Sequence, residues 1–173
     1  MLVVAATERE LAHVRRFDTL CCGVGPVEAA ARTAHALEER EPGAVVHIGI
    51  AGARAIEPLT LVLGSEAVYE DADGALVPSR VAPDAALLER VRAALPEALV
   101  LPIGTSARVG GGSACEVEAM EGFGVLRACE LAGVPAVELR AISNSPDEND
   151  RSKWRFEEAF ALLGDALDRL DVL

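Results

Sequence analysis

Short apolar runs alternate with longer helix-forming segments along most of the chain. The runs whose composition predicts strands are residues 2–6, 19–22, 44–48, 59–69 (bent at Gly64), 99–103, 105–109 and 135–142. Several of these runs are apolar at consecutive positions, as is typical of strands that are buried on both faces. Such a sheet needs helices on each side. The pattern therefore predicts an α/β fold with three layers, α/β/α, around a central mixed and twisted sheet.

Capping and turn residues mark the ends of the expected helices. The expected helices are one that begins at Thr7, residues 27–39, 83–95 and 118–132, and one that begins near Ser152. Thr7 and Glu10 stand in the capping-box relation, and Gly133 follows the fourth helix. The stretch 49–53 and the glycine-rich run 110–113 are expected to be flexible loops. No internal repeat or linker interrupts the pattern, which predicts a single domain over residues 1–173.

Composition narrows the range of partners. The chain has 173 residues, of which 51% are hydrophobic, so it can bury a substantial core. Its 16 basic and 28 acidic residues give a net charge of -12. A surface this negative repels nucleic-acid phosphates and anionic lipid headgroups. We therefore expect no nucleic-acid or membrane partner, and a small-molecule ligand stays open.

The cysteines and the N-terminus favour a cytoplasmic location. The four cysteines form no C-x-x-C pair, and they are expected to be reduced thiols; they are Cys21, Cys22, Cys115 and Cys129. The opening MLVVAATERE has no basic segment before its apolar stretch. No apolar run reaches the roughly 20 residues that cross a bilayer.

Several common motifs are incomplete. The third glycine of a G-x-G-x-x-G dinucleotide motif that begins at Gly23 would fall at Glu28, whose side chain is too large for that place. The glycine-rich run near residue 110 is not followed by Lys and Ser or Thr, as a nucleotide-phosphate loop requires. The three histidines lack metal-ligand spacing and are interpreted as structural or exposed. No G-x-S-x-G elbow is present. We expect no cofactor and no metal.

Polar residues interrupt the apolar pattern where strands end or helices begin. They are Glu10 (with Glu8), Glu121 and Asn144. Ligands of open α/β sheets bind near the carboxyl ends of strands, so Glu10 and Asn144 could meet in one crevice. Each residue also has an ordinary structural interpretation. Glu10 completes a capping box, Glu121 can be a plain helix glutamate, and asparagine is a frequent turn former.

Taken together, these segments resemble a known superfamily. The segments ATERE, CGVGPVEAA, HIGIAGA, SEAVYEDAD, EAMEG and VPAVELRAISN occur in the order found in purine nucleoside phosphorylases and nucleosidases. The likeness covers most of the chain, and EAMEG followed by RAISN is its most specific part. The stretch RAISN followed by DRSKW is most similar to the futalosine hydrolases. The resemblance implies the phosphorylase fold and hydrolysis of futalosine to hypoxanthine on a route to menaquinone.

The resemblance assigns a role to several residues. Glu10 matches the general base, which activates a water molecule at the anomeric carbon. Met120 and Glu121 match a ribose-binding pair, whose carboxylate also favours an oxocarbenium-like transition state. Ala51 and Gly52, within HIGIAGA, belong to the expected substrate-binding set.

Asn144 indicates which base is released. Adenine-specific relatives carry aspartate here, which can donate a proton to N7, whereas an amide only donates and accepts hydrogen bonds. Asn144 therefore favours a 6-oxopurine. Trp154 is expected at the 5′ end of the pocket, with a helix-core role as the alternative. Tyr69 and Phe123 are weaker candidates for contact with the substrate.

Some choices stay open at this point. Ile50 stands where a phosphate ligand would need a polar residue, and the loop 23–26 lacks a basic residue, so water is the expected nucleophile. Alternatives are a methylthioadenosine or S-adenosylhomocysteine nucleosidase, a purine nucleoside phosphorylase, and an inactive nucleoside-binding homologue. The segments 74–83 and 109–117 look shorter than in the family, which leaves the base-stacking residue unassigned. Family likeness implies a homodimer or larger homo-oligomer.

Overall fold

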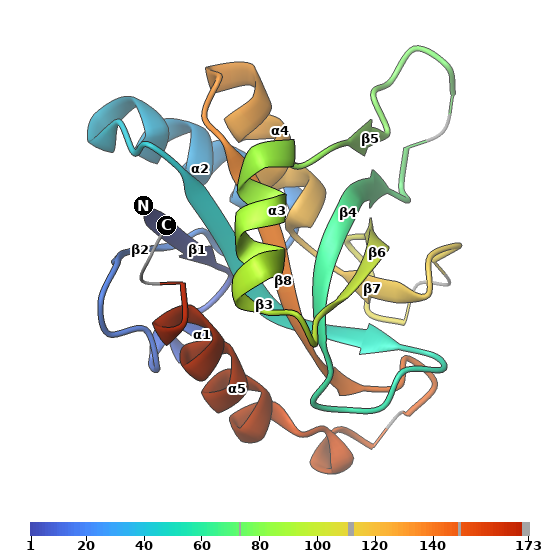
Figure 1. Cartoon of the computed structure of the whole chain (residues 1–173). Helices are drawn as coiled ribbons and strands as arrows, with labels where there is room; N and C mark the ends of the chain where they lie inside the picture. Colours follow the sequence, from blue (N-terminus) through green and yellow to red (C-terminus); the bar gives the residue numbers. More distant parts are fainter. Residues whose placement is uncertain (73, 111–112, 149, 171–173) are drawn as a thin grey trace.

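The computed structural model describes residues 1–72, 74–110, 113–148 and 150–170, and its strands form one mixed sheet (Figure 1). Asp73 of SEAVYEDAD and Gly111 and Gly112 of the expected glycine-rich loop lie outside the described residues. The strands are β1 (Leu2–Ala5), β2 (Asp18–Cys21), β3 (Val45–Ala53), β4 (Leu61–Tyr69), β5 (Arg80–Val81), β6 (Leu99–Thr105), β7 (Val117–Ala119) and β8 (Ala136–Asn144). Their order is β2-β1-β3-β7-β6-β4-β5, and β8 pairs with both β3 and β4.

Part of the sheet closes on itself. Strand β3 pairs along its length with β8 and near its end with β7, while β8 pairs with β4, β4 with β6, and β6 with β7. These five strands thus form a ring. A core cluster drawn from the same five strands consists of Ala51, Ala53, Val62, Ile103, Val117, Ala119 and Ile142.

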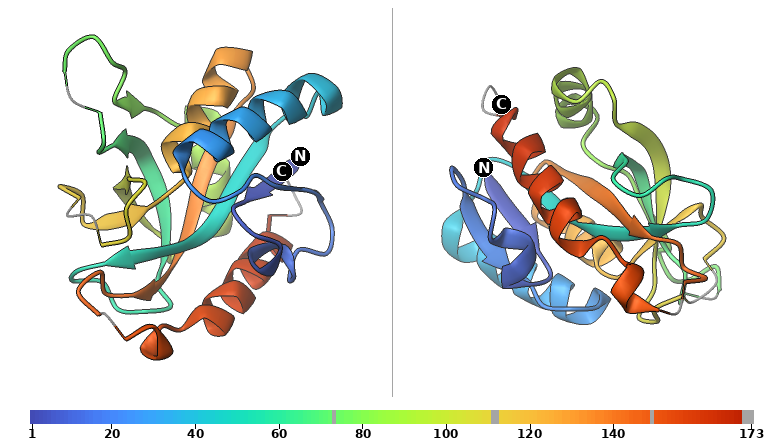
Figure 2. Two further views of the ribbon diagram at one scale, coloured as in Figure 1. Left: turned by 180° about the vertical axis from the view of Figure 1, so that it is seen from behind. Right: turned by 90° about the horizontal axis from the view of Figure 1, so that it is seen from below.

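Helices cover both faces of the sheet. They are α1 (Glu8–Leu11), α2 (Pro26–Arg40), α3 (Ala85–Ala94), α4 (Gly122–Ala132) and α5 (Phe156–Asp168). In β1, Val3 and Ala5 share a core with α3 and α5, whereas Leu2 and Val4 share one with α2 and α4. Figure 2 shows α2 and α4 together on one side of the sheet. The predicted three-layer α/β fold is confirmed, whereas the closed ring of five strands was not predicted.

Local sequence explains where several elements begin and end. The capping box at α1 is present: Thr7 Oγ1 accepts from Glu10 N, and the Glu10 carboxylate accepts from Thr7 N. Pro26 occupies the first turn of α2, where its missing N–H has no intrahelical partner to lose. Gly133 ends α4 at φ 69°, a left-handed conformation that favours glycine.

Four predicted segments differ from the structure. Residues 49–53, expected to be a loop, continue β3 because β7 and β8 supply hydrogen-bond partners. Residues 117–119, partly assigned to a helix, form β7, and the helix begins only at Gly122. The strand expected over 105–109 is wrong beyond Thr105, where β6 ends. The last helix begins at Phe156, after a short 3-10 turn at Arg151–Lys153.

Within the residues that the structure describes, none of the helices combines the length and the apolar character needed to cross a membrane.

Candidate active site

A cavity of about 260 Å³ opens at the ends of β1, β3, β7 and β8. Its lining, mostly apolar with a few polar side chains, suits a small organic ligand. Seven residues that the sequence assigned to catalysis or substrate binding line it: Glu10, Ala51, Gly52, Met120, Glu121, Asn144 and Trp154. Segments far apart in the chain therefore contribute to one site.

Glu10 lies on α1 and is 5% exposed. Its Oε2 accepts hydrogen bonds from Thr7 N at 2.9 Å and from Thr7 Oγ1 at 3.0 Å, and its Oε1 accepts one from Ile50 N at 3.2 Å. Burial raises the pKa of Glu10, and the carboxylate of Glu121 raises it further, while Arg140 lowers it. A carboxylate with a raised pKa is a stronger proton acceptor than an ordinary surface glutamate.

Glu121 precedes α4 and is 4% exposed. Its Oε1 accepts a hydrogen bond from Gly25 N at 3.1 Å, so the loop before α2 fixes the carboxylate. Its Oε2 lies 3.6 Å from Arg140 Nη2. Both Glu121 and its neighbour Met120 line the cavity, which allows a carboxylate and a thioether to contact the same ligand.

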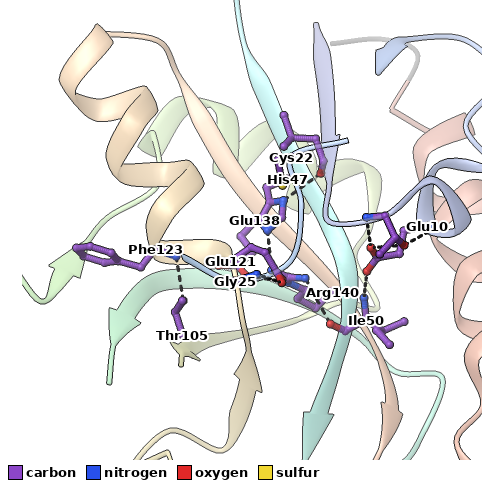
Figure 3. A network of polar contacts seen from close by, with 12 residues as sticks. Glu10, Cys22, Gly25, His47, Ile50, Thr105, Glu121, Phe123, Glu138 and Arg140 are labelled. Atoms are coloured by element: carbon purple, nitrogen blue, oxygen red, sulfur yellow. Dashed lines mark hydrogen bonds and ion pairs between the residues drawn. The ribbon is translucent and has the colours of Figure 1, made fainter. Parts of the chain in front are cut away.

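Arg140 lies between these carboxylates (Figure 3) and is not among the residues that line the cavity. It lies on β8, is fully buried, and donates from Nε to Glu138 Oε1 at 2.7 Å. Its Nη2 lies 2.6 Å from His47 Nε2, and its Nη1 donates to the Ile50 carbonyl at 3.4 Å. We call Glu10, Glu121, Glu138, Arg140 and His47 the charged cluster.

His47 is the neutral member of the charged cluster. Its Nδ1 lies 3.0 Å from the Val4 carbonyl, an acceptor only, so Nδ1 carries the proton and Nε2 accepts from Arg140. Burial lowers the pKa of His47 well below its usual value, and the charge of Arg140 lowers it further. Of the two sequence-based interpretations of His47, structural or exposed, its full burial agrees with the first.

Asn144 ends β8 beside the cavity and is 8% exposed. Its Oδ1 accepts from Ser143 Oγ at 2.7 Å, and its Nδ2 donates to the Ser145 carbonyl at 3.0 Å. An amide nitrogen has two N–H groups and the oxygen has two lone pairs. Each atom therefore keeps the capacity for one further hydrogen bond to a ligand.

Aromatic side chains form another part of the cavity lining. Trp154, Phe156 and Phe160 lie there with Arg9, and we call these four residues the aromatic wall. The Trp154 and Phe156 rings are 5.5 Å apart, and the Arg9 guanidinium lies 5.5 Å from the Phe160 ring. Trp154 precedes α5, and its Nε1 donates to the Glu148 carbonyl at 2.9 Å. Trp154 is half-buried, so it can contact a ligand without being a helix-core residue.

Tyr69 and Phe123 are not brought to this cavity. Their rings stack on each other with centroids 5.0 Å apart, and Phe123 belongs to the core beneath α2 and α4. In Figure 3 the Phe123 ring points away from the charged cluster. At the start of α4, Phe123 N donates to Thr105 Oγ1 at the end of β6, and the ring stacks on Tyr69 of β4.

Glu138 and Arg140 were not among the site residues predicted from the sequence. A signal was present, because they are two charged residues spaced two apart in the otherwise apolar strand 135–142. That spacing places both on one face of a buried strand, which requires charged partners there. Among the described residues, no group of three or more His, Cys, Asp or Glu side chains is arranged to hold a metal ion.

Comparison with known proteins places this geometry in context. The family profile described as the phosphorylase superfamily matches residues 19–171. A futalosine hydrolase of Streptomyces coelicolor is 37% identical, over 89% of this chain and 78% of the relative. A futalosine hydrolase of Acidothermus cellulolyticus is 33% identical over the same shares.

Solved structures are similar in fold. A futalosine hydrolase mutant of Helicobacter pylori superposes with a TM-score of 0.90 at 16% identity, covering 99% of this chain and 98% of that one. A 5'-methylthioadenosine/S-adenosylhomocysteine nucleosidase of Neisseria meningitidis, in complex with methylthio-immucillin-A, gives a TM-score of 0.87 at 20% identity, covering 98% and 96%. Two kinds of nucleosidase therefore share this architecture.

Proposed function

The chain belongs to the phosphorylase superfamily, and from this premise we propose that it is a nucleosidase that hydrolyses the N-glycosidic bond of futalosine and releases hypoxanthine. One observation carries the proposal. Glu10, Glu121 and Asn144, which are far apart in the sequence, line the same cavity. A base, a ribose-binding carboxylate and a base-binding amide can thus act on one nucleoside.

Glu10 activates the attacking water. Its carboxylate takes a proton while the water oxygen bonds to C1′ of the ribose, and the electron pair of the breaking C1′–N9 bond leaves with the purine. The hydrogen bonds from Thr7 and Ile50 hold the carboxylate in place. Glu10 must be ionised to act, so activity should be lost as the pH falls, and the raised pKa puts this loss at a higher pH than for an ordinary glutamate.

Glu121 and Met120 bind the sugar. The Glu121 carboxylate accepts hydrogen bonds from ribose hydroxyls, and its negative charge stabilises the positive charge that develops on the ring in the transition state. The Met120 thioether packs against the apolar side of the ribose. Gly25 N and Arg140 hold Glu121, so its carboxylate is oriented before the ligand arrives.

Asn144 stabilises the leaving base. A departing 6-oxopurine spreads negative charge onto O6 and N7, and the Asn144 Nδ2 can donate a hydrogen bond to either atom. An amide cannot transfer a proton, which a departing adenine needs at N7. Asn144 therefore favours hypoxanthine over adenine as the product.

Water is the nucleophile rather than phosphate. The cavity side of the charged cluster presents the carboxylates of Glu10 and Glu121, which repel an anion. The arginines of the lining already have anionic partners: Arg9 pairs with Glu157 at 2.5 Å, and Arg108 lies 3.7 Å from Asp71. Arg54 donates to the Cys115 carbonyl and pairs with Glu118 at 3.2 Å.

The wider setting follows from the same proposal. Futalosine hydrolysis would place the chain in menaquinone biosynthesis, with a small nucleoside as its ligand. A cytoplasmic location, a homodimer or larger homo-oligomer, and the lack of nucleic-acid and membrane partners stay predictions.

Base release from several nucleosides tests the proposal. The purified protein is incubated with futalosine, inosine, methylthioadenosine and S-adenosylhomocysteine, each with and without phosphate, and the free base is measured. We expect hypoxanthine release from futalosine at a rate that phosphate does not change. Faster adenine release, or turnover that requires phosphate, would contradict the proposal. Saturable nucleoside binding without base release would indicate an inactive homologue.

A further inference from the structure

Three members of the charged cluster, Arg140, Glu138 and His47, do not line the cavity, and Glu138 and His47 take much of the hydrogen-bonding capacity of Arg140. The two strands that carry them explain the arrangement. His47 on β3 is the register partner of Glu138 on β8, and Gly49 is the register partner of Arg140. The Arg140 side chain lies over Gly49, a position without a β-carbon, and so approaches Glu10 on α1.

Glycines make the space that the charged cluster occupies. A β-carbon at Gly49 would clash with Arg140 Nη1 and lie 2.8 Å from Glu10 Oε1. A β-carbon at Gly122 would clash with the Glu138 carboxylate. Neither glycine has a positive φ, so both positions require a small residue for space and not for backbone conformation. The fold thus provides room for this arrangement on a strand and at a helix start.

The orientation of Arg140 depends on these two partners. Glu138 accepts from Nε, and His47 accepts from Nη2, so the two acceptors fix adjacent edges of the planar guanidinium. The remaining directions face the Ile50 carbonyl and Glu121 Oε2. Ile50 in turn donates from its N–H to Glu10. A rotation of the guanidinium would therefore disturb the surroundings of both cavity carboxylates.

The burial of Glu138 is costly for a residue with only a structural role. The side chain is fully buried, and its Oε2 has no hydrogen-bond partner within the described residues. An unpaired buried carboxylate oxygen lowers the free energy of unfolding, and apolar residues often replace buried ion pairs without loss of stability. Such a cost is typical of functional sites.

We infer that Glu138 and His47 are positioning residues, which hold the Arg140 guanidinium and through it orient the carboxylates of Glu10 and Glu121 for glycosidic cleavage. The inference rests on the proposed function and deepens it. Neither residue contacts the substrate. Glu138 supplies an anion that offsets the charge of Arg140, and His47 supplies an uncharged acceptor.

Glu138→Gln separates charge from geometry. Glutamine keeps an oxygen that accepts from Arg140 Nε but removes the negative charge, so the positive charge of Arg140 near Glu10 is no longer offset by its paired anion. The charged groups that act on Glu10 from the neighbouring elements are Arg140 on β8 and Glu121 before α4. Neither of them is substituted in the variant. We therefore expect the pKa of Glu10 to fall by about half a unit to one unit.

Carbon-13 NMR of glutamate-labelled protein measures this directly. The Glu10 carboxyl signal is identified by its loss in Glu10→Gln, and its pKa is compared between wild type and Glu138→Gln. Glu66→Gln is the matched control, because Glu66 pairs with Arg80 on β4 and β5, outside the cavity lining. An unchanged Glu10 pKa in Glu138→Gln would overturn the inference. Since titration needs no turnover, it tests the inference even if the wild type cleaves no nucleoside.

Steady-state kinetics tests whether the hydrogen-bond acceptor at residue 138 is needed to orient the Arg140 guanidinium. Glu138→Leu removes the acceptor, and we expect kcat to fall at least about 10-fold with KM changed less than about threefold. Glu138→Gln should restore most of kcat, with the acid limb of the pH profile shifted to lower pH. His47→Gln, which keeps an acceptor oxygen, should likewise exceed His47→Leu in kcat. Wild-type kcat and pH profile in folded Glu138→Leu would overturn the inference, and Glu138→Gln decides alone if the leucine variant does not fold.

Discussion

The charged cluster and the aromatic wall form two parts of one site with opposite construction. The charged cluster joins three strand residues, His47, Glu138 and Arg140, to Glu10 on α1 and Glu121 before α4, and it is almost wholly enclosed, with Arg140 and Glu138 fully buried. The aromatic wall is built on helices and on the turn before α5: Arg9 on α1 is largely exposed and Trp154 is half-buried, whereas Phe160 on α5 is buried. Enclosed groups suit bond cleavage, which needs fixed geometry, whereas the more exposed side chains suit substrate selection.

The largest effect should come from Glu10→Gln, which removes the proposed general base from the charged cluster. Glutamine cannot accept the proton of the attacking water, so we expect kcat to fall by about 10²- to 10⁴-fold. Steady-state base release measures the effect. Glu8→Gln is the matched control, since Glu8 is an exposed residue of the same helix, and it should keep wild-type activity. A Glu10→Gln variant with more than a tenth of wild-type kcat would exclude Glu10 as the base.

Asn144 belongs to neither the charged cluster nor the aromatic wall, and Asn144→Asp changes the group that is proposed to bind the leaving base. A protonated aspartate can donate a proton to N7, so we expect the ratio of adenine to hypoxanthine release to rise at least about 10-fold. Competition assays with methylthioadenosine and futalosine measure this ratio. Asn144→Ala should slow both reactions without reversing the preference. An unchanged ratio in the aspartate variant would mean that Asn144 does not choose the base.

Trp154→Ala affects the aromatic wall alone. Loss of a ring that contacts the substrate should raise KM about 10-fold while kcat changes little, because the reacting atoms keep their surroundings. Tyr69→Ala is the comparison, because Tyr69 stacks on Phe123 outside the cavity, and the folded variant should keep the wild-type KM. If Trp154→Ala lowers kcat and leaves KM alone, the division between the two regions is wrong.

The smallest effect concerns stability, through His47. The folded protein keeps His47 neutral, whereas the unfolded chain binds a proton below about pH 6.5. The contribution of His47 to the free energy of unfolding is therefore complete above about pH 6.5, and it is lost as the pH falls below that value. His47→Gln should flatten this decline by up to about 1.4 kcal/mol per pH unit, measured by urea unfolding at pH 5 to 8. His35→Gln, at an exposed position, should keep the wild-type slope, and a His47→Gln slope equal to wild type would show that His47 is not held neutral.

The sequence was sufficient for those features that depend on local pattern. The alternation of apolar and polar positions predicts the layers, and the capping box locates the start of α1 correctly. The extension of β3 through residues 49–53 was missed, because glycines in a strand are tolerated only when neighbours supply pairing on both sides. That pairing comes from β7 and β8, which lie far along the chain.

The site residues likewise divide into those that the local pattern predicts and those that depend on strand pairing. Glu10, Glu121 and Asn144 stand out in the sequence because each interrupts an apolar edge, and the structure brings them together in the cavity. The charged cluster behind them could not be assembled without the register of β3 and β8, which sets His47 opposite Glu138. Phe156 and Phe160 were not predicted as site residues, yet both lie on α5 in the cavity lining.

A crystal structure with hypoxanthine tests the central claim most directly, because it shows which side chains meet the base. The account predicts that the purine occupies the cavity, with N7 or O6 at hydrogen-bond distance from Asn144 Nδ2, and that Glu10 and Glu121 face the place of the ribose. Hypoxanthine bound at another surface, or bound in the cavity with Asn144 turned away from it, would contradict the account.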